Sequence, residues 1–129
     1  MKVLLSIIFS LLQIAVVFNA HGQSGIGFNS SVLDGISLTN PTNLAFGPDN
    51  KLYVTQQDGT IFGLTVQKNG PNDYQVTNTE VILLVKNIPN HSDIGQVVTL
   101  TARQITGIVT AGTSTNPILY ICSSDPRIG

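Results

Sequence analysis

The sequence contains little that could stabilise a fold covalently or attract a charged partner. Its 129 residues include one cysteine, Cys122, no tryptophan and only 10% charged residues. A lone cysteine excludes the disulfide framework of many small secreted domains. Its place in an apolar run predicts a buried side chain. With a formal net charge of −1 and no basic cluster, the chain is not expected to bind nucleic acid.

The longest apolar run lies at the amino terminus. One positive charge precedes the run from Val3 to Phe18, and the small residues Ala20 and Gly22 follow it. This order is typical of a cleavable secretory signal; an uncleaved anchor or lipoprotein-like tether is the alternative. We predict a signal peptide over residues 1–22, cleaved after Ala20 or Gly22. The mature chain, 23–129, is then secreted, periplasmic or at the cell surface, without a transmembrane segment.

Strand and turn signals alternate along the mature chain. Its content of Thr, Asn, Gly, Val and Ile favours strands and turns over helices. Asp58-Gly59 separates two runs of β-branched and aromatic residues, which predicts a β-hairpin. We expect a polar loop over 68–73 and four strands, over residues 43–46, 51–56, 60–66 and 81–85. Short connections between successive strands predict a meander, the arrangement of a propeller blade.

An internal repeat supports this interpretation. The stretch Leu52 to Asp58 (LYVTQQD) recurs as Leu119 to Asp125 (LYICSSD), and an apolar strand precedes each copy. Such repetition is typical of propellers. We therefore predict an all-β fold, a β-propeller, represented by about one and a half four-stranded blades. Because a propeller closes only with about four or more blades, we expect this to be the N-terminal part of a longer protein. A small β-protein complete at this length, with open sheet edges, is the alternative.

Several stretches resemble the opening blades of the glucose/sorbosone dehydrogenase family. They are residues 40–49 with 52–54 (NPTNLAFGPD and LYV), 88–95 (IPNHSDIG), 104–108 (QITGI) and 116–121 (NPILYI). The resemblance implies a six-bladed secreted propeller. It also implies pyrroloquinoline quinone and calcium as cofactors, used by the enzymatic members to oxidise a sugar hydroxyl. The family's catalytic histidine and quinone-binding basic residues lie further along than this chain runs.

Two functions therefore remain open. The chain resembles a quinone-dependent sugar dehydrogenase, but enzymatic members show a Gly-Leu-Leu-Gly pattern at the start of the second blade. Here Gln104 replaces the first glycine and Thr106 the second leucine. The alternative is a non-catalytic propeller module of a larger surface protein that binds carbohydrate or another protein. Fold alone does not decide between them.

Four residues are candidates for contacts in the propeller channel. His91 and Asp93 lie in the turn-rich connection before the second blade, where they could support a polar ligand or calcium. The alternative is a solvated loop whose side chains cap their own backbone. Arg103 and Gln104 begin the presumed innermost strand and could point into the channel. Their alternative is a structural hydrogen bond between blades. No catalytic residue is assigned.

Other conspicuous residues are explained without a ligand. Asp49 and Asp58 have the character of turn residues. Tyr53 and Tyr120 hold equivalent strand positions, so we expect them to pack and not to form a sugar platform. The tripeptide Asn90-His91-Ser92 matches the N-glycosylation acceptor pattern, which also occurs often by chance.

Overall fold

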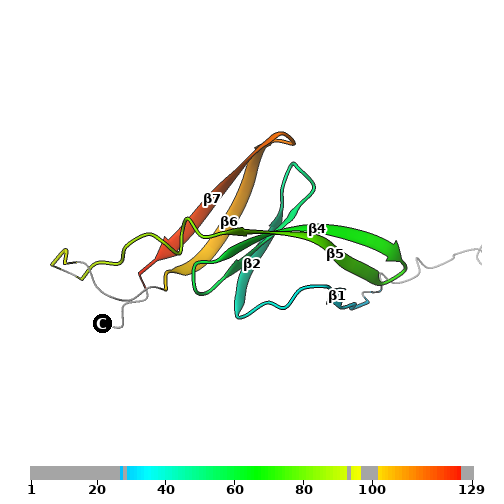
Figure 1. Ribbon diagram of the computed structural model, residues 1–129, viewed down its shortest axis with the longest axis horizontal. Helices are drawn as coiled ribbons and strands as arrows, with labels where there is room; N and C mark the ends of the chain where they lie inside the picture. The colour runs from blue at the N-terminus through cyan, green and yellow to red at the C-terminus, as the bar shows by residue number, and fades with distance from the viewer. Residues whose placement is uncertain (1–26, 28, 93, 97–101, 126–129) are drawn as a thin grey trace, which may run out of the picture.

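The computed structural model describes residues 27, 29–92, 94–96 and 102–125. Within these residues every regular element is a β-strand, as the composition predicts, and the all-β class is confirmed (Figure 1). None of the described segments forms a helix long and apolar enough to cross a membrane. The predicted signal peptide, 1–22, lies outside the described residues.

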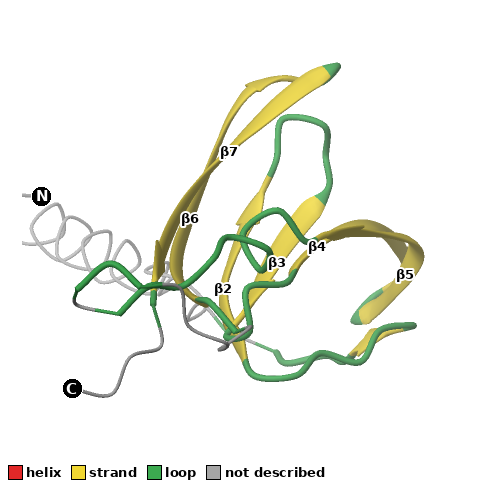
Figure 2. Ribbon diagram, turned by 60° about the vertical axis from the view of Figure 1, so that its left-hand side comes forward, coloured by secondary structure: helices red, strands yellow, loops and turns green. Residues whose placement is uncertain are grey.

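Seven strands form two sheets: β1 (Leu33–Asp34), β2 (Pro41–Phe46), β3 (Leu52–Gln56), β4 (Ile61–Gly70), β5 (Asp73–Ile82), β6 (Gln104–Thr113) and β7 (Asn116–Ser124). The first sheet has the order β1-β5-β4-β3-β2, and the second is the β6–β7 hairpin. From β2 to β5 each strand pairs antiparallel with the next, which confirms the meander. β1 adds a parallel pairing to β5. Figure 2 shows how this five-stranded sheet curls, with the hairpin beside β2 and β3.

The boundaries of β4 and β5 differ from the prediction. Both strands enter the predicted polar loop 68–73, and only Pro71 and Asn72 separate them. Asn72 has a φ of 58°, the left-handed conformation that lets the chain reverse in so few residues. The predicted strand 81–85 is only the end of β5 and the turn after it. Residues 77–80 are all exposed, and this polar stretch concealed the strand from apolar patterning.

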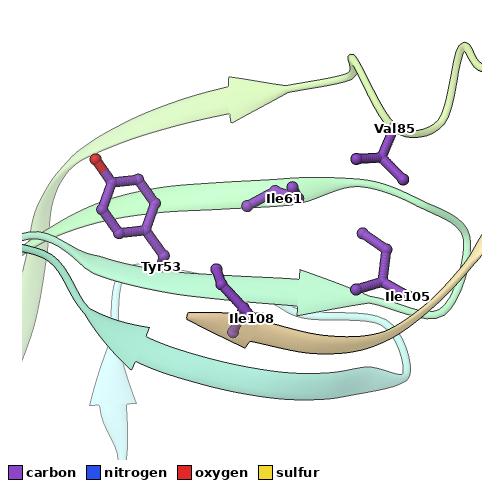
Figure 3. Close-up of a cluster of buried hydrophobic side chains, with 5 residues drawn as sticks. All are labelled: Tyr53, Ile61, Val85, Ile105 and Ile108. Atoms are coloured by element: carbon purple, nitrogen blue, oxygen red, sulfur yellow. The ribbon is translucent and has the colours of Figure 1, made fainter. Parts of the chain in front are cut away.

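The main hydrophobic cluster lies between the meander and the β6–β7 hairpin. Figure 3 shows its buried members, Tyr53, Ile61, Val85, Ile105 and Ile108. Ile61 is 1% exposed and Ile105 0%. Full burial of such a side chain contributes roughly 1.5–3 kcal/mol. A hydrogen bond from Thr110 Oγ1 to the Phe46 carbonyl, 2.7 Å long, adds a polar link. Together these contacts fix the hairpin on one face of the sheet.

A second cluster covers the opposite face of the meander. Its buried members are Val54, Leu64 and Val76. The chain before β2 packs over them with Leu33, Ile36 and Leu38. Successive strand residues point to opposite faces, so neighbours along β3 enter different clusters. The sheet is therefore covered on one side by the hairpin and on the other by the segment 33–38.

Both copies of the sequence repeat lie in antiparallel hairpins, although the registers of the two hairpins differ. In β2–β3, Ala45 lies opposite Tyr53. In β6–β7, Val109 lies opposite Tyr120. The repeat is thus a repeat of hairpins, each with an apolar first strand and the tyrosine in its second strand.

The prediction that Cys122 is buried is wrong, because its side chain is exposed. Burial alternates strictly along β7. Leu119 and Ile121 pack against the main cluster, whereas Tyr120 and Cys122 point the other way. Only one face of the hairpin is covered, so half of an apolar run remains open to solvent.

Candidate functional site

A pocket of about 280 Å³ lies where the two hairpins meet. It is bounded by the start of β2, the end of β3 and the start of β6. Its lining residues are Thr39, Asn40, Gln57, Asp58, Ala102 and Gln104. Of the three predicted channel contacts that the structure describes, Gln104 lines this pocket. The ends of strands from neighbouring hairpins thus bring the polar side chains together.

Backbone contacts hold the walls of the pocket. The Gln57 amide donates to the Asn40 carbonyl at 3.0 Å, which joins the end of β3 to the start of β2. Gly59 lies behind this wall with a φ of 90°. A Cβ atom there would come within 2.8 Å of Lys86 Cα and 2.9 Å of the Arg103 carbonyl. Glycine is therefore needed where three backbone segments approach one another.

Asp58 is the acidic group of the pocket. Its Oδ1 accepts from the Thr60 amide at 3.0 Å, and its Oδ2 accepts from Thr60 Oγ1 at 3.0 Å and from Lys86 Nζ at 2.6 Å. Burial acts to raise the pKa of Asp58, but the hydrogen bonds from Lys86 and Thr60 outweigh it, so this pKa lies below its ordinary value. Asp58 is therefore ionised at neutral pH, with Lys86 balancing its charge.

The other polar lining groups are neutral. Asn40, Gln57 and Gln104 carry side-chain amides, and Thr39 carries a hydroxyl. An amide presents donors and an acceptor together, and a hydroxyl does the same. This lining matches the hydrogen-bonding pattern of a neutral ligand rich in hydroxyl groups.

Arg103 joins the loop before β6 to the end of β7. Its Nε donates to Ser123 Oγ at 3.1 Å, and its Nη1 donates to Asn90 Oδ1 at 3.2 Å and to Asp125 Oδ1 at 3.0 Å. Asn90, 1% exposed, also donates from Nδ2 to the Ala102 carbonyl at 2.8 Å. These are hydrogen bonds within the protein, the structural alternative considered for Arg103.

The remaining two candidates are His91 and Asp93. His91 is exposed in the connection between β5 and β6, and it is not among the lining residues. Asp93 lies outside the described residues. Among the described residues, no three His, Cys, Asp or Glu side chains lie together as a metal site. The calcium and the quinone that the resemblance implies stay predictions.

Sequence reasoning missed the residues that line the pocket beside Gln104. Asn40 has a φ of 47° directly before β2, and Gln57 lies in the repeated stretch just after β3. Both are polar residues next to the end of a strand, and this pattern could have identified them as candidates in the sequence. Asn90 was noted only as a glycosylation pattern, yet its buried amide is bonded on both sides, so the folded chain does not present it for modification.

Comparisons of the chain with protein-family models, curated proteins and solved structures gave no match. The resemblance to glucose/sorbosone dehydrogenases therefore stays a prediction. The site must be interpreted from its own geometry.

Proposed function

We propose that this chain contributes about one and a half blades of a secreted β-propeller, and that its pocket forms part of a binding site for a sugar or glycan. The observation that carries the proposal is that five of the six lining residues are polar: Asn40, Gln57 and Gln104, with Thr39 and Asp58 beside them. The β2–β3 and β6–β7 hairpins and the residues next to them supply these groups. In a propeller, they would lie at the junction of neighbouring blades.

The charge balance of the pocket favours a neutral ligand. The Asp58 carboxylate is paired with Lys86 Nζ at 2.6 Å, so an anionic ligand gains no free cation there. Amides and a carboxylate can instead accept and donate hydrogen bonds to successive hydroxyl groups. A volume of about 280 Å³ is near the lower end of small-molecule sites. One sugar ring is the natural occupant.

The more specific form of the proposal is a quinone-dependent sugar dehydrogenase, which oxidises a sugar hydroxyl to a carbonyl. Its support is that the stretches resembling this family coincide with β2, β3, β6 and β7. The quinone would accept the electrons when bound. No catalytic step is assigned to the described residues.

The alternative form is a non-catalytic module that binds carbohydrate or another protein. Gln104 and Thr106 favour it, because they replace the small and apolar residues of the enzymatic pattern. Gln104 lines the pocket, and the enzymatic pattern has a glycine at this position. A glutamine side chain at this position can hydrogen-bond a saccharide, and it leaves less room in the pocket for a large cofactor than a glycine would.

Binding is tested with the secreted chain and a panel of neutral mono- and disaccharides, by calorimetry. Gln104→Ala and Asn40→Ala each remove an amide from the lining, and we expect at least about tenfold weaker binding for each. Asn69→Ala is the matched control, because Asn69 is exposed at the far end of β4. Equal affinities in all variants, or no saccharide binding at all, would contradict the proposal.

The two forms are separated by an oxidation assay on the native secreted product. Its intact mass, with the coding frame read past Gly129, defines the protein to be assayed. The product is then loaded with pyrroloquinoline quinone and calcium, and sugar-dependent reduction of a dye is followed. Turnover supports the dehydrogenase, whereas saccharide binding without turnover supports the non-catalytic module.

A further inference from the structure

Arg103 lies between two residues that line the pocket. Ala102 and Gln104 both belong to the lining, whereas the Arg103 side chain bonds to other protein groups and is 18% exposed. A mostly buried side chain beside a pocket can hold the lining residues in place without contacting what binds there. The partners of Arg103 therefore decide what it contributes to the pocket.

The Arg103 guanidinium joins the end of β7 to the β5–β6 connection. It donates to Ser123 and Asp125 at the end of β7 and to Asn90 in the connection, at distances from 3.0 to 3.2 Å. The Asp125 side chain is 16% exposed, so this ion pair is largely shielded from water. Because the guanidinium is planar and its donors point in fixed directions, the three bonds together define one position for it.

The same contacts fix the backbone on either side of Arg103. Asn90, which accepts from Arg103, donates from Nδ2 to the Ala102 carbonyl at 2.8 Å and is 1% exposed. Gln104 begins β6 and pairs with Ser124, which lies between the two residues at the end of β7 that Arg103 contacts. One wall of the pocket is therefore held by Arg103 and Asn90 together.

The backbone of Arg103 reaches the facing wall of the pocket. Its amide nitrogen lies 3.5 Å from the carbonyl oxygen of Asp58, which is another lining residue. Its carbonyl oxygen would lie 2.9 Å from a Cβ atom on Gly59, so the two segments approach closely there. The position of Arg103 thus sets how far Ala102 and Gln104 stand from the wall that carries Asp58.

We propose that Arg103 is the positioning residue of this pocket. It holds Ala102 and Gln104 at their spacing from Asp58, and the affinity for a saccharide depends on that spacing, although Arg103 does not contact the saccharide. The inference rests on the proposed sugar binding for one readout and on the sugar-free pocket for another. If Arg103 only stabilised the fold, the pocket would keep its affinity in any variant that stays folded.

The first experiment measures saccharide affinity by calorimetry, at a temperature where circular dichroism shows every variant to be folded. Arg103→Met removes all the donors, and we expect at least about fivefold weaker binding. Arg103→Lys keeps a positive charge beside Asp125 and should recover part of this loss. Val76→Ala, in the second hydrophobic cluster, is the control for lowered stability alone and should bind like the wild type.

A double variant shows whether Arg103 acts through Gln104. If it does, Arg103→Met combined with Gln104→Ala should bind hardly more weakly than the weaker of the two single variants, because both changes remove the same contact with the saccharide. Fully additive losses would overturn the positioning role, and so would an unchanged affinity in Arg103→Met. Either result would leave the proposed sugar binding intact.

The second experiment needs no saccharide. The close approach of the Arg103 and Gly59 backbones should give nuclear Overhauser effects between them in the sugar-free protein. These should weaken in Arg103→Met but persist in Arg103→Lys and in Val76→Ala. Full retention in Arg103→Met would overturn the inference, whether or not a saccharide binds. Weakened effects in a protein whose wild type binds no saccharide would support the positioning of the wall and contradict the proposed function.

Discussion

Tyr53 and Tyr120 occupy the same position in the two copies of the sequence repeat, yet Tyr53 is 3% exposed and Tyr120 is 60% exposed. The Tyr53 ring lies between Gly47 and Gly63, and its hydroxyl donates to Asp49 Oδ2 at 2.9 Å. Tyr120 has no hairpin over it among the described residues. The environment of the repeated tyrosine is thus set by what packs on its hairpin, and not by its local sequence.

Ile105 anchors the hairpin on the meander, so its truncation should destabilise the fold strongly. Ile105→Ala removes a 0% exposed side chain from the main cluster and should cost about 2–5 kcal/mol. Val109, on the opposite face of the same strand, is 64% exposed, and Val109→Ala should change stability by less than about 0.5 kcal/mol. Urea unfolding of dilute protein measures both. Similar costs for the two variants would contradict the docking of β6 by its inner face.

Gly47 permits the close approach of the β2–β3 turn to Tyr53. A Cβ atom at Gly47 would contact Asp49 Oδ1 and Tyr53 Cε2 too closely. Gly47→Ala should therefore destabilise the chain by about 1–3 kcal/mol, as overpacking does. At Gly70 the nearest atom to an added Cβ is 3.9 Å away, so Gly70→Ala serves as the control. A stability for Gly47→Ala equal to that of the control would show that the turn relaxes freely.

The sequence predicted the fold best where strand and turn chemistry is local. Asp58-Gly59 correctly marked the β3–β4 hairpin, and the repeat marked the two equivalent hairpins. The pairing of β1 with β5 escaped prediction, because two residues carry no periodicity of their own. Cys122 was placed on the wrong side, because an apolar run does not reveal which of its faces is covered.

For the candidate site, the sequence identified one lining residue but not the group of residues that lies around it. Gln104 was correctly placed at the start of a strand, β6. Its neighbours Asn40 and Gln57 come from another hairpin, and only the packing of the two hairpins brings them together. Arg103 illustrates the opposite case, since a basic residue beside the site is held by Asn90 and Asp125, a long-range contact that no spacing rule predicts.

Because Lys86 pairs with Asp58, the free energy of unfolding should decrease as the pH falls into the acidic range. The pKa of Asp58 is lowered in the fold, so the Asp58–Lys86 contribution is present above the unfolded value, about pH 4. It is lost as pH falls through the lower folded value. Lys86→Met should cost up to about 1 kcal/mol at pH 6, because both side chains are partly exposed. The difference from wild type should shrink toward pH 2 in chemical unfolding experiments.

Lys68→Met is the control for this acid dependence. Lys68 faces the ring of Tyr74, with Nζ 5.6 Å from its centre, and in the described structure it pairs with no carboxylate. Its effect should be the same at pH 6 and near pH 3. If the loss of stability in Lys86→Met were equally independent of pH, the ion pair would not lower the pKa of Asp58.

Tyr53 should make the stability fall at high pH. Burial, and then the hydrogen bond to Asp49, raise the pKa of Tyr53 to about 12. The unfolded chain loses this proton at about pH 10, so between these values the native state binds more protons. The stabilisation is complete below about pH 10 and is lost as pH rises through the folded value. In Tyr53→Phe the tyrosinate absorbance step near pH 12 should disappear, and the free energy of unfolding should fall less steeply above pH 10. Identical slopes for the two proteins would show that Tyr53 ionises as readily folded as unfolded.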